Sequence, residues 1–277
     1  MIVISGSQPF DPAGLPEEEL SLYRLKDQSP VRYQYSSVGE LRFELGMRAA
    51  IQQAARDLNA SGAAFATFRT SRCNPAYWER TPEGAFRLRS DVTPADGIRD
   101  IFRNGHLYAF ECATAMVICL YRGALAQMGD EAFNRHFADL ELYDWHYDSD
   151  LRLTTLPERK EAYPGDILYF VNPDVSPATP WWQGENGILL DADLYYGHGV
   201  GIKSAQGIID SLNKHRRPNS SQSAYLKDQV SFPDYTYLYG LSTGAGPGSG
   251  PSPRSWMQAR RGWAAAQIGS RGLLQLG

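Results

Sequence analysis

Cys112 is the residue of this chain whose surroundings best suit nucleophilic chemistry. It lies in Tyr108-Ala-Phe-Glu-Cys-Ala-Thr-Ala-Met116, where small and apolar residues follow one thiol at the predicted start of a helix. The N-terminal end of a helix carries unpaired N–H groups and a partial positive charge, which favour a thiolate over a thiol. We therefore expect the pKa of Cys112 to be lowered toward neutrality and the residue to act as a nucleophile.

Two downstream residues supply the acid–base groups that such a nucleophile requires. Glu185 lies in Trp181-Trp-Gln-Gly-Glu-Asn186, and His198 lies in Tyr195-Tyr-Gly-His-Gly-Val-Gly201. The two segments read as strands of one hairpin, and a turn centred on residues 191–192 would place Glu185 directly opposite His198. A shift of one residue would leave the two side chains diagonal neighbours. The sequence thus predicts a site built from cysteine, histidine and glutamate.

A thiolate with such partners performs acyl transfer. It attacks a carboxamide or ester, a neighbouring base moves the proton, and a thioester forms as intermediate. Cysteine at a helix start followed by histidine on a later strand is the order of papain-like cysteine enzymes. Each residue also has a purely structural alternative. Cys112 would be a small hydrophobic residue of the core, as we expect Cys119 to be, and His198 would be a hydrogen-bonded residue of a strand. Glu185 would then be a plain hairpin-end carboxylate, and His146 is the rival base.

Metal and nucleotide chemistry are disfavoured by the spacing of the candidate ligands. A zinc site from Cys112, Cys119, His198 and Glu185 would lack any C-x-x-C or H-x-x-x-H pattern. The glycines at 197, 199 and 201 follow no strand–helix–strand signature of a dinucleotide-binding loop. We therefore expect no metal and no other cofactor.

The composition limits the remaining function classes. The chain has 277 residues and a formal net charge of −4, which gives no overall positive field for nucleic acid. Three cysteines fit a reducing compartment better than a disulfide-stapled fold. The apolar start at residues 1–5 has no basic flank, and the longest apolar stretch, 113–120, is far short of the roughly 20 residues of a membrane helix. We expect cytoplasmic synthesis without a signal peptide, no membrane and no nucleic-acid partner.

The elements that must position these groups form an α+β pattern. The clearest helix spans residues 36–62, where Ser37 and Glu40 match a capping box and Gly62 is a stop signal. Polar residues mark the side of this helix that we expect to be exposed; they are Glu44, Arg48, Gln52 and Arg56. Shorter helices are predicted over 93–104 and 206–214, and the helix that begins at Cys112 is apolar enough to be packed on most sides.

Strands dominate the second half of the chain. Alternating or apolar runs at 140–145, 166–171, 187–190 and 194–197 predict a central antiparallel sheet packed against the helices. The domain organisation follows from a change in composition. We expect a catalytic domain over residues 1–239, a linker rich in Gly, Pro and Ser over 240–253, and a basic, disordered tail over 254–277.

Several long motifs resemble one known family. They are Phe110-Glu-Cys-Ala-Thr-Ala115, Leu142-Tyr-Asp-Trp-His-Tyr147, Gly165-Asp-Ile-Leu-Tyr-Phe-Val-Asn-Pro173, Trp182-Gln-Gly-Glu-Asn186, Gly197-His-Gly-Val-Gly-Ile202 and Gln222-Ser-Ala-Tyr-Leu226. In this order and spacing, from about Met1 to Phe232, the chain resembles the bacterial spore-coat protein-glutamine γ-glutamyltransferases. The glycine-rich linker and tail depart from that pattern.

The resemblance implies an enzyme that joins glutamine side chains to lysine amines of coat proteins without calcium, releasing ammonia. It implies a compact fold related to the papain-like NlpC/P60 enzymes and deposition of the protein on the spore coat. It also implies roles for residues: Cys112 matches the nucleophile, Glu185 the carboxylate that works with it and His198 the family histidine. Glu111, which precedes the nucleophile, matches a glutamate with a supporting catalytic role. Whether Glu185 or His198 is the principal base stays open.

The thioester must be shielded from water, which competes with the amine acceptor. Aromatic residues near the two motifs are the expected walls of a narrow apolar passage for the substrate; they are Trp145, Trp181, Trp182, Tyr195 and Tyr196. Two alternatives use the same chain differently. A cysteine amidase or peptidase of the NlpC/P60 type would pass the acyl group to water, and a non-catalytic coat scaffold would use only the basic tail.

Overall fold

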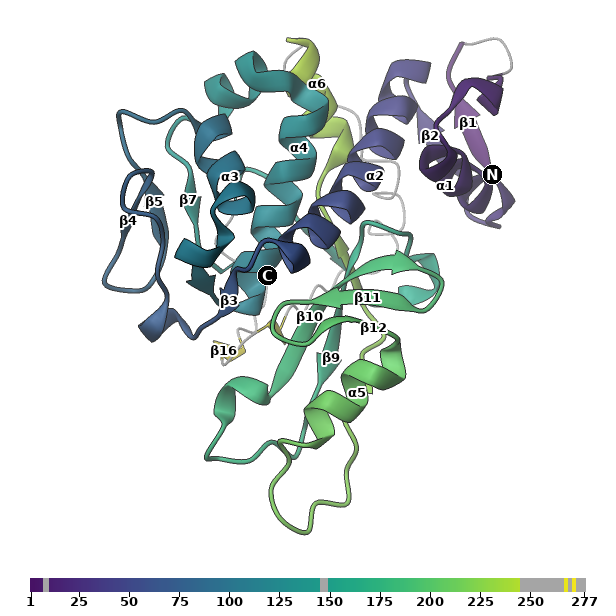
Figure 1. The fold of residues 1–277 in the computed structure, drawn as a ribbon. Coiled ribbons are helices and arrows are strands. Elements are labelled where there is room, and N and C mark those ends of the chain that lie inside the picture. The colour runs from purple at the N-terminus through teal and green to yellow at the C-terminus, as the bar shows by residue number, and fades with distance from the viewer. Residues whose placement is uncertain (7–9, 145–148, 245–266, 269–270, 273–277) are drawn as a thin grey trace.

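The structure is a computed structural model that describes residues 1–6, 10–144, 149–244, 267–268 and 271–272 (Figure 1). The α-helices of this part are α1 (Glu17–Gln28), α2 (Val38–Ala60), α3 (Pro94–Arg103), α4 (Cys112–His136), α5 (Ala205–Asn213) and α6 (Tyr235–Thr243). The strands are β1 (Ile2–Ile4), β2 (Tyr33–Tyr35), β3 (Ala64–Phe65), β4 (Trp78–Arg80), β5 (Phe86–Leu88), β6 (Ala109–Phe110), β7 (Glu141–Leu142), β8 (Thr154–Leu156), β9 (Ile167–Val171), β10 (Gly184–Asp191), β11 (Leu194–Gly197), β12 (Gly201–Lys203), β13 (Tyr225–Leu226), β14 (Val230–Phe232), β15 (Gln267–Ile268) and β16 (Arg271–Gly272).

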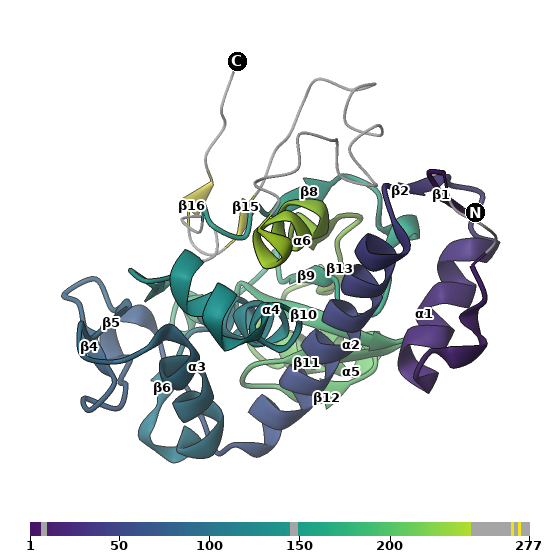
Figure 2. The ribbon, with the colours of Figure 1, turned by 90° about the horizontal axis from the view of Figure 1, so that it is seen from above.

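An antiparallel sheet in the order β12-β11-β10-β9-β14-β8 is the platform of the molecule, and β13 also pairs with β9. Helices α2 and α4 cross over one face of it and α5 covers the other, as Figures 1 and 2 show from two directions. The expected α+β architecture, with an antiparallel sheet packed against helices, is confirmed.

Strand alternation sends neighbouring residues of β10 and β11 into two different core clusters. Ile188 and Tyr196 point toward α2 and α4 and belong to the large core that these helices share with α3 and α6. Leu189 and Tyr195, one residue along on each strand, point the other way and pack with Leu212 of α5. Neighbouring residues of β10 therefore face different compartments.

Helix α2 begins where the capping box predicts. The Ser37 hydroxyl oxygen accepts a hydrogen bond from the Glu40 N–H at 3.1 Å, and the Glu40 carboxylate accepts one from the backbone N–H of Ser36 at 2.7 Å. Helix α3 is likewise capped by Thr93 and starts with Pro94. Local signals thus set the start of both helices.

The predicted exposed side of α2 is wrong for two of its residues. Glu44 and Arg48 are 2% and 0% exposed, whereas Arg56 is exposed. The reason is an ion network that links α1, α2 and the start of β9. Lys26 Nζ lies 2.5 Å from Glu44 Oε1, and Arg48 binds both Glu44, at 2.8 Å, and Asp166, at 2.7 Å. Helix α1 covers what would otherwise be a solvated face, and the charges are buried in pairs.

The β10–β11 hairpin is shifted by one residue from the predicted register. Gly187 pairs with Gly197 and Ile188 with Tyr196, whereas Asp191 pairs with Leu194. The turn is therefore centred on residues 192–193 instead of 191–192, and the irregularity between Leu189 and Asp191 leaves the rest of the hairpin one residue from the predicted register. A slip of one residue moves a side chain to the opposite face of the sheet. Glu185 is therefore not the cross-strand partner of His198.

The structure describes only part of the region where composition predicts the domain boundaries. Helix α6 includes residue 239, and it ends at Thr243 before Gly244, whose φ of +69° caps it in the left-handed conformation. In the predicted tail, β15 and β16 pair with each other. Most of the predicted linker and tail lies outside the described residues.

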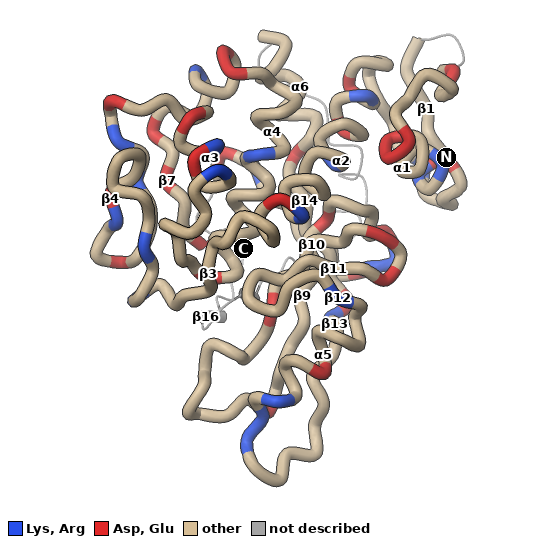
Figure 3. The backbone as a smooth tube through the Cα atoms, in the orientation of Figure 1, with Lys and Arg blue, Asp and Glu red and all other residues tan. Residues whose placement is uncertain are grey.

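Charged residues of both signs alternate along the backbone tube (Figure 3). In the part of the chain that the structure describes, no helix is both long and apolar enough to cross a bilayer. In the same part, no group of three or more His, Cys, Asp or Glu side chains is arranged to hold a metal ion.

Candidate active site

Cys112 is the first residue of α4, at the point where the chain leaves β6. Strand β6 runs parallel to β3, with Phe110 paired to Phe65, and the chain turns into the helix at Glu111. Glu111 is the N-cap: its Oε2 accepts a hydrogen bond from the Ala113 N–H at 2.7 Å. The predicted position of the thiol at a helix N-terminus is confirmed, and the thiol is 5% exposed.

Two side chains contact the sulfur of Cys112. The thiol donates to Oε1 of Glu111, with 3.3 Å between Sγ and the oxygen. Nδ2 of Asn186 lies 3.3 Å from Sγ and donates to it. The sulfur therefore has a proton acceptor on one side and an N–H donor on the other.

The pKa of Cys112 is raised, contrary to the expectation from the helix start. Burial disfavours the thiolate first, and the charges of Glu111 and Glu185 disfavour it further. N–H groups of Asn186, from backbone and side chain, act in the opposite direction but are outweighed. The helix terminus offers only about half an elementary charge, which does not balance two carboxylates in a buried site. The direction of this shift favours the neutral thiol over the thiolate.

Glu185 is buried beside this group, on the second residue of β10. It is 3% exposed, and its pKa is raised by burial and by the neighbouring charge of Glu111. Gly197 makes the room for it, because a Cβ atom there would lie 2.9 Å from Glu185 Cγ and 3.0 Å from Oε1. Among the described residues, no hydrogen-bond donor reaches Oε1 of Glu185.

His198 is buried, but its ring nitrogens are bound to groups other than the thiol. Nε2 lies 3.1 Å from the Ala64 carbonyl oxygen, which can only accept, so Nε2 carries the proton. Nδ1 then accepts from the Tyr196 hydroxyl at 2.9 Å, and the ring stacks on Phe110 with 4.6 Å between centroids. Burial lowers the pKa of His198 to about 4. His198 is therefore neutral near pH 7, and its ring packs on Phe110 in the segment before Cys112.

The predicted aromatic residues occupy different places. Trp181 and Trp182 form a short 3-10 helix (Pro180–Trp182) before β10; Trp181 is 42% exposed, and Trp182 stacks on His215 at 4.0 Å. Tyr195 and Tyr196 point to opposite faces of β11, toward α5 and toward the main core. Trp145, like the rival base His146, lies outside the described residues.

A family model described as protein-glutamine gamma-glutamyltransferase matches residues 1–242. The chain belongs to this family. Its members are transglutaminases, acyltransferases that cross-link proteins. The match includes every residue of the buried thiol site, so the fold and the site belong to one transglutaminase domain.

Curated relatives and a solved structure agree with this assignment. The transglutaminase of Bacillus pumilus is 47% identical over 249 residues, which cover 86% of this chain and 98% of the relative. That of Halalkalibacterium halodurans is 46% identical over 198 residues, 72% of this chain and 69% of the relative. The structure of the Geobacillus stearothermophilus transglutaminase without its C-terminal extension has a TM-score of 0.71 at 50% identity, and the match covers 74% of this chain and 98% of that one.

Two residues at the transglutaminase site were not predicted by a search of the sequence for reactive residue types. Asn186 contacts the sulfur, and Tyr169, its partner across β9 and β10, has a raised pKa because of burial and the charges of Cys112, Glu111 and Glu185. Gly184 leaves space for the Tyr169 hydroxyl, which a Cβ atom would approach to 2.2 Å. The signal available in the sequence is strand alternation, which puts Asn186 rather than Glu185 on the α4 face of β10.

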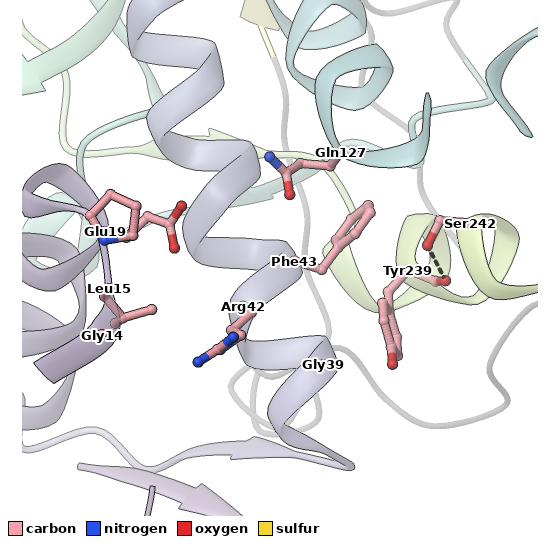
Figure 4. Close-up of a pocket in the computed structure, with 10 residues that line it drawn as sticks. Gly14, Leu15, Glu19, Gly39, Arg42, Phe43, Gln127, Tyr239 and Ser242 are labelled. Atoms are coloured by element: carbon pink, nitrogen blue, oxygen red, sulfur yellow. Dashed lines mark hydrogen bonds between the residues drawn. The ribbon is translucent and has the colours of Figure 1, made fainter. Parts of the chain in front are cut away.

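A separate surface cavity of about 450 Å³ lies between α1, α2, α4 and α6 (Figure 4). Its lining includes Glu19, Arg42, Gln127 and Tyr239, and none of the predicted site residues. The candidate active site of the transglutaminase is therefore the buried thiol cluster and not this cavity.

Proposed function

We propose that this transglutaminase forms isopeptide bonds between glutamine and lysine side chains through a thioester on Cys112. The hydrogen bond from the Cys112 thiol to Glu111, with 3.3 Å between the heavy atoms, is the observation that carries the proposal. It gives the sulfur an immediate proton acceptor within the same helix N-terminus. The domain fits the papain-like NlpC/P60 plan in having its nucleophile at a helix start that faces a sheet.

In the first half-reaction, Sγ of Cys112 attacks the carbonyl carbon of the glutamine γ-carboxamide while its proton passes to Glu111. The new C–S bond forms and the C–N bond then breaks, with the proton returned to the leaving nitrogen as ammonia departs. A neutral thiol suits this step because the proton leaves only as the bond to carbon forms. The raised pKa of the Glu111 carboxyl, caused by burial, makes it a stronger base than an exposed glutamate.

In the second half-reaction, a lysine amine attacks the thioester carbon. The amine is mostly protonated near neutral pH, so a carboxylate must first take its proton. Glu185 is suited to this task, since its pKa is also raised by burial and its Oε1 has no donor among the described residues. The C–S bond breaks as the amide bond forms, and the thiol of Cys112 recovers a proton.

Burial of the sulfur supports transfer over hydrolysis. Cys112, Glu185 and Asn186 are each no more than 5% exposed, so bulk water does not surround the thioester. Trp181 and Trp182 immediately precede β10 and are our candidates for contact with the protein substrate. We retain Trp145 and Tyr195 as substrate-contact predictions, whereas the Tyr196 hydroxyl orients His198.

We propose spore-coat proteins as the substrates and the coat as the place of deposition, on the motifs shared with the spore-coat enzymes. The chemistry needs no Lewis acid, because a thiol, two carboxyl groups and an amide suffice for acyl transfer. We therefore expect EDTA to leave the rate unchanged and added Ca²⁺ not to raise it. Loss of activity in EDTA would contradict the calcium-independent reaction.

The decisive experiment measures incorporation of a labelled primary amine into a glutamine-containing protein, together with ammonia release. We expect the wild type to perform both and Cys112→Ala to perform neither. Cys119→Ala is the matched control, because Cys119 lies two turns further along the same helix and is also buried. Ammonia release without amine incorporation would identify an amidase, and an active Cys112→Ala variant would refute the nucleophile.

A second experiment tests the proton acceptor. Glu111→Gln keeps the shape of the side chain and its cap but cannot take the proton, so we expect kcat to fall by about 10²–10⁴-fold. Removal of the charge should also lower the pKa of Cys112 and speed its alkylation by iodoacetamide at pH 8. Glu131→Gln, at an exposed position of the same helix, should change neither quantity. Unchanged kcat in Glu111→Gln would transfer the role to Glu185.

A further inference from the structure

Asn186 donates a hydrogen bond to the sulfur of Cys112, and the sequence motifs assign it no role. It is 1% exposed, and alternation along β10 turns its side chain toward the core that contains α4. Its Nδ2 donates to Sγ of Cys112 at 3.3 Å, and its backbone N–H also favours the charged sulfur. One residue thus directs two N–H groups at the nucleophile.

The other end of the same amide is an unused acceptor. Oδ1 of Asn186 is buried and accepts no hydrogen bond from any residue that the structure describes. The oxygen and nitrogen of the amide share one carbon, so Oδ1 is part of the same rigid group whose Nδ2 contacts the sulfur. A buried acceptor without a donor is costly in a folded protein, so such atoms call for a partner that arrives with the ligand.

Oε1 of Glu185, on the next residue, is buried and equally without a donor in the described part of the chain. Of these two acceptors, Oδ1 of Asn186 belongs to the side chain that contacts the sulfur. A ligand that satisfies Oδ1 must bring an N–H or O–H group to the amide that holds the sulfur. A primary carboxamide brings two N–H groups and an alkylammonium brings three, whereas an ester brings none at that position.

We propose that Asn186 recognises the nitrogen of both substrates: Oδ1 accepts from the N–H of the glutamine carboxamide and then of the incoming amine, while Nδ2 holds the sulfur. This inference rests on the proposed acyl transfer and names its specificity-determining residue. It explains how a buried thiol selects a carboxamide over an ester. A site built to bind an N–H group loses that contact outright with an ester, which leaves the acceptor unpaired.

The test compares a glutamine peptide with the same peptide carrying a γ-phenyl ester, using a fixed labelled amine. Asn186→Leu removes both ends of the amide, and we expect its kcat/KM for the glutamine peptide to fall about tenfold more than for the ester. The isosteric Asn186→Asp keeps an acceptor but loses the donor to sulfur, so it should slow both substrates by a similar factor. Asn74→Leu is the matched control: Asn74 is also buried but binds Asp100 and Ala76, so the amide-to-ester ratio should not change.

Equal losses on amide and ester in Asn186→Leu, or no loss on either, would overturn the recognition of nitrogen by Asn186. If Asn186→Leu does not fold, as judged by thermal unfolding, Asn186→Asp decides alone: a lost amide preference in this variant overturns the proposal. The wild type separates the two hypotheses. Absence of amine transfer from the glutamine peptide in wild type defeats the proposed function, whereas transfer with an unaltered ratio in the variants defeats only the role of Asn186.

Discussion

At the scale of single residues, burial disfavours the charged forms of three groups in and around the site. The Cys112 thiol and the Glu185 carboxyl both have raised pKa values because they are buried among like charges. His198 has a lowered pKa for the same reason, burial, since its charged form is the protonated one. These directions oppose a preformed ion pair between the thiol of Cys112 and His198, and they favour a thiol that loses its proton during the reaction.

The neutral state of His198 has a measurable effect on stability. Its pKa is about 4 in the folded protein against 6.5 for an ordinary histidine, so the unfolded chain binds the extra proton first as the pH falls. Stability contributed by neutral His198 is complete above pH 6.5 and is lost as the pH falls toward 4, by about 3 kcal/mol in total. We predict that the difference in unfolding free energy between wild type and His198→Gln shrinks by this amount from pH 7 to pH 4.

Urea unfolding of both proteins across this pH range measures that difference, and the comparison cancels the titration of all other groups. The pH dependence of kcat adds a functional check. If His198 is neutral and only structural, the plot of kcat against pH for His198→Gln should keep the shape of the wild-type plot, even where the rate of the variant is lower. Parallel stability curves for the two proteins would show that His198 binds its proton as readily in the folded protein as in the unfolded chain, which would contradict the lowered pKa.

At the scale of elements, the helix starts, which depend on local sequence signals, were predicted better than the pairing of strands. Ser37 and Thr93 mark the starts of α2 and α3 because an N-cap needs only its own turn. The β10–β11 register depends on where the turn is centred and on the irregularity between Leu189 and Asp191, neither of which composition reveals. The resulting shift decides that Glu185 is not the cross-strand partner of His198.

Burial of a helix face is equally non-local. Arg48 and Arg56 look alike in sequence, two turns apart on α2, yet only Arg48 is covered by neighbouring elements. We predict that Arg48→Met lowers the free energy of unfolding by about 3–5 kcal/mol, because Glu44 and Asp166 lose a buried partner. Arg56→Met should change it by no more than about 0.5 kcal/mol. Urea denaturation measures the free energy of unfolding of both variants. Equally small losses in Arg48→Met and Arg56→Met would contradict a stabilising role of the buried ion network.

At the scale of the whole molecule, the sequence predicted the fold class and the family, because long motifs and strand patterns survive local errors. The position of the thiol at the start of a helix was predicted as well. The orientation of His198 was not, since Nε2 of the ring binds the carbonyl oxygen of Ala64, which comes from a distant part of the chain. The C-terminal boundary was placed from composition alone, and composition does not register that Leu241 is 8% exposed and packs in the main core.

The extent of the catalytic unit follows from this packing. Helix α6 lies against α2 and α4, with Leu238 fully buried and Tyr239 5.7 Å from the ring of Phe43. The family match ends at residue 242, one residue before the end of the helix. We predict that a chain ending at Gly244 keeps amine incorporation within about twofold of the full chain and the same stability within about 0.5 kcal/mol.

A chain ending at residue 239 is the matched comparison. It removes Gly240 and Leu241, both buried, and opens the last turn of α6, so we expect a loss of about 2–5 kcal/mol in unfolding free energy. Urea unfolding and the amine assay on the three chains give both quantities. Loss of activity in the 244-residue chain at unchanged stability would make the segment beyond α6 part of substrate capture, because the core that holds Cys112 would still be complete.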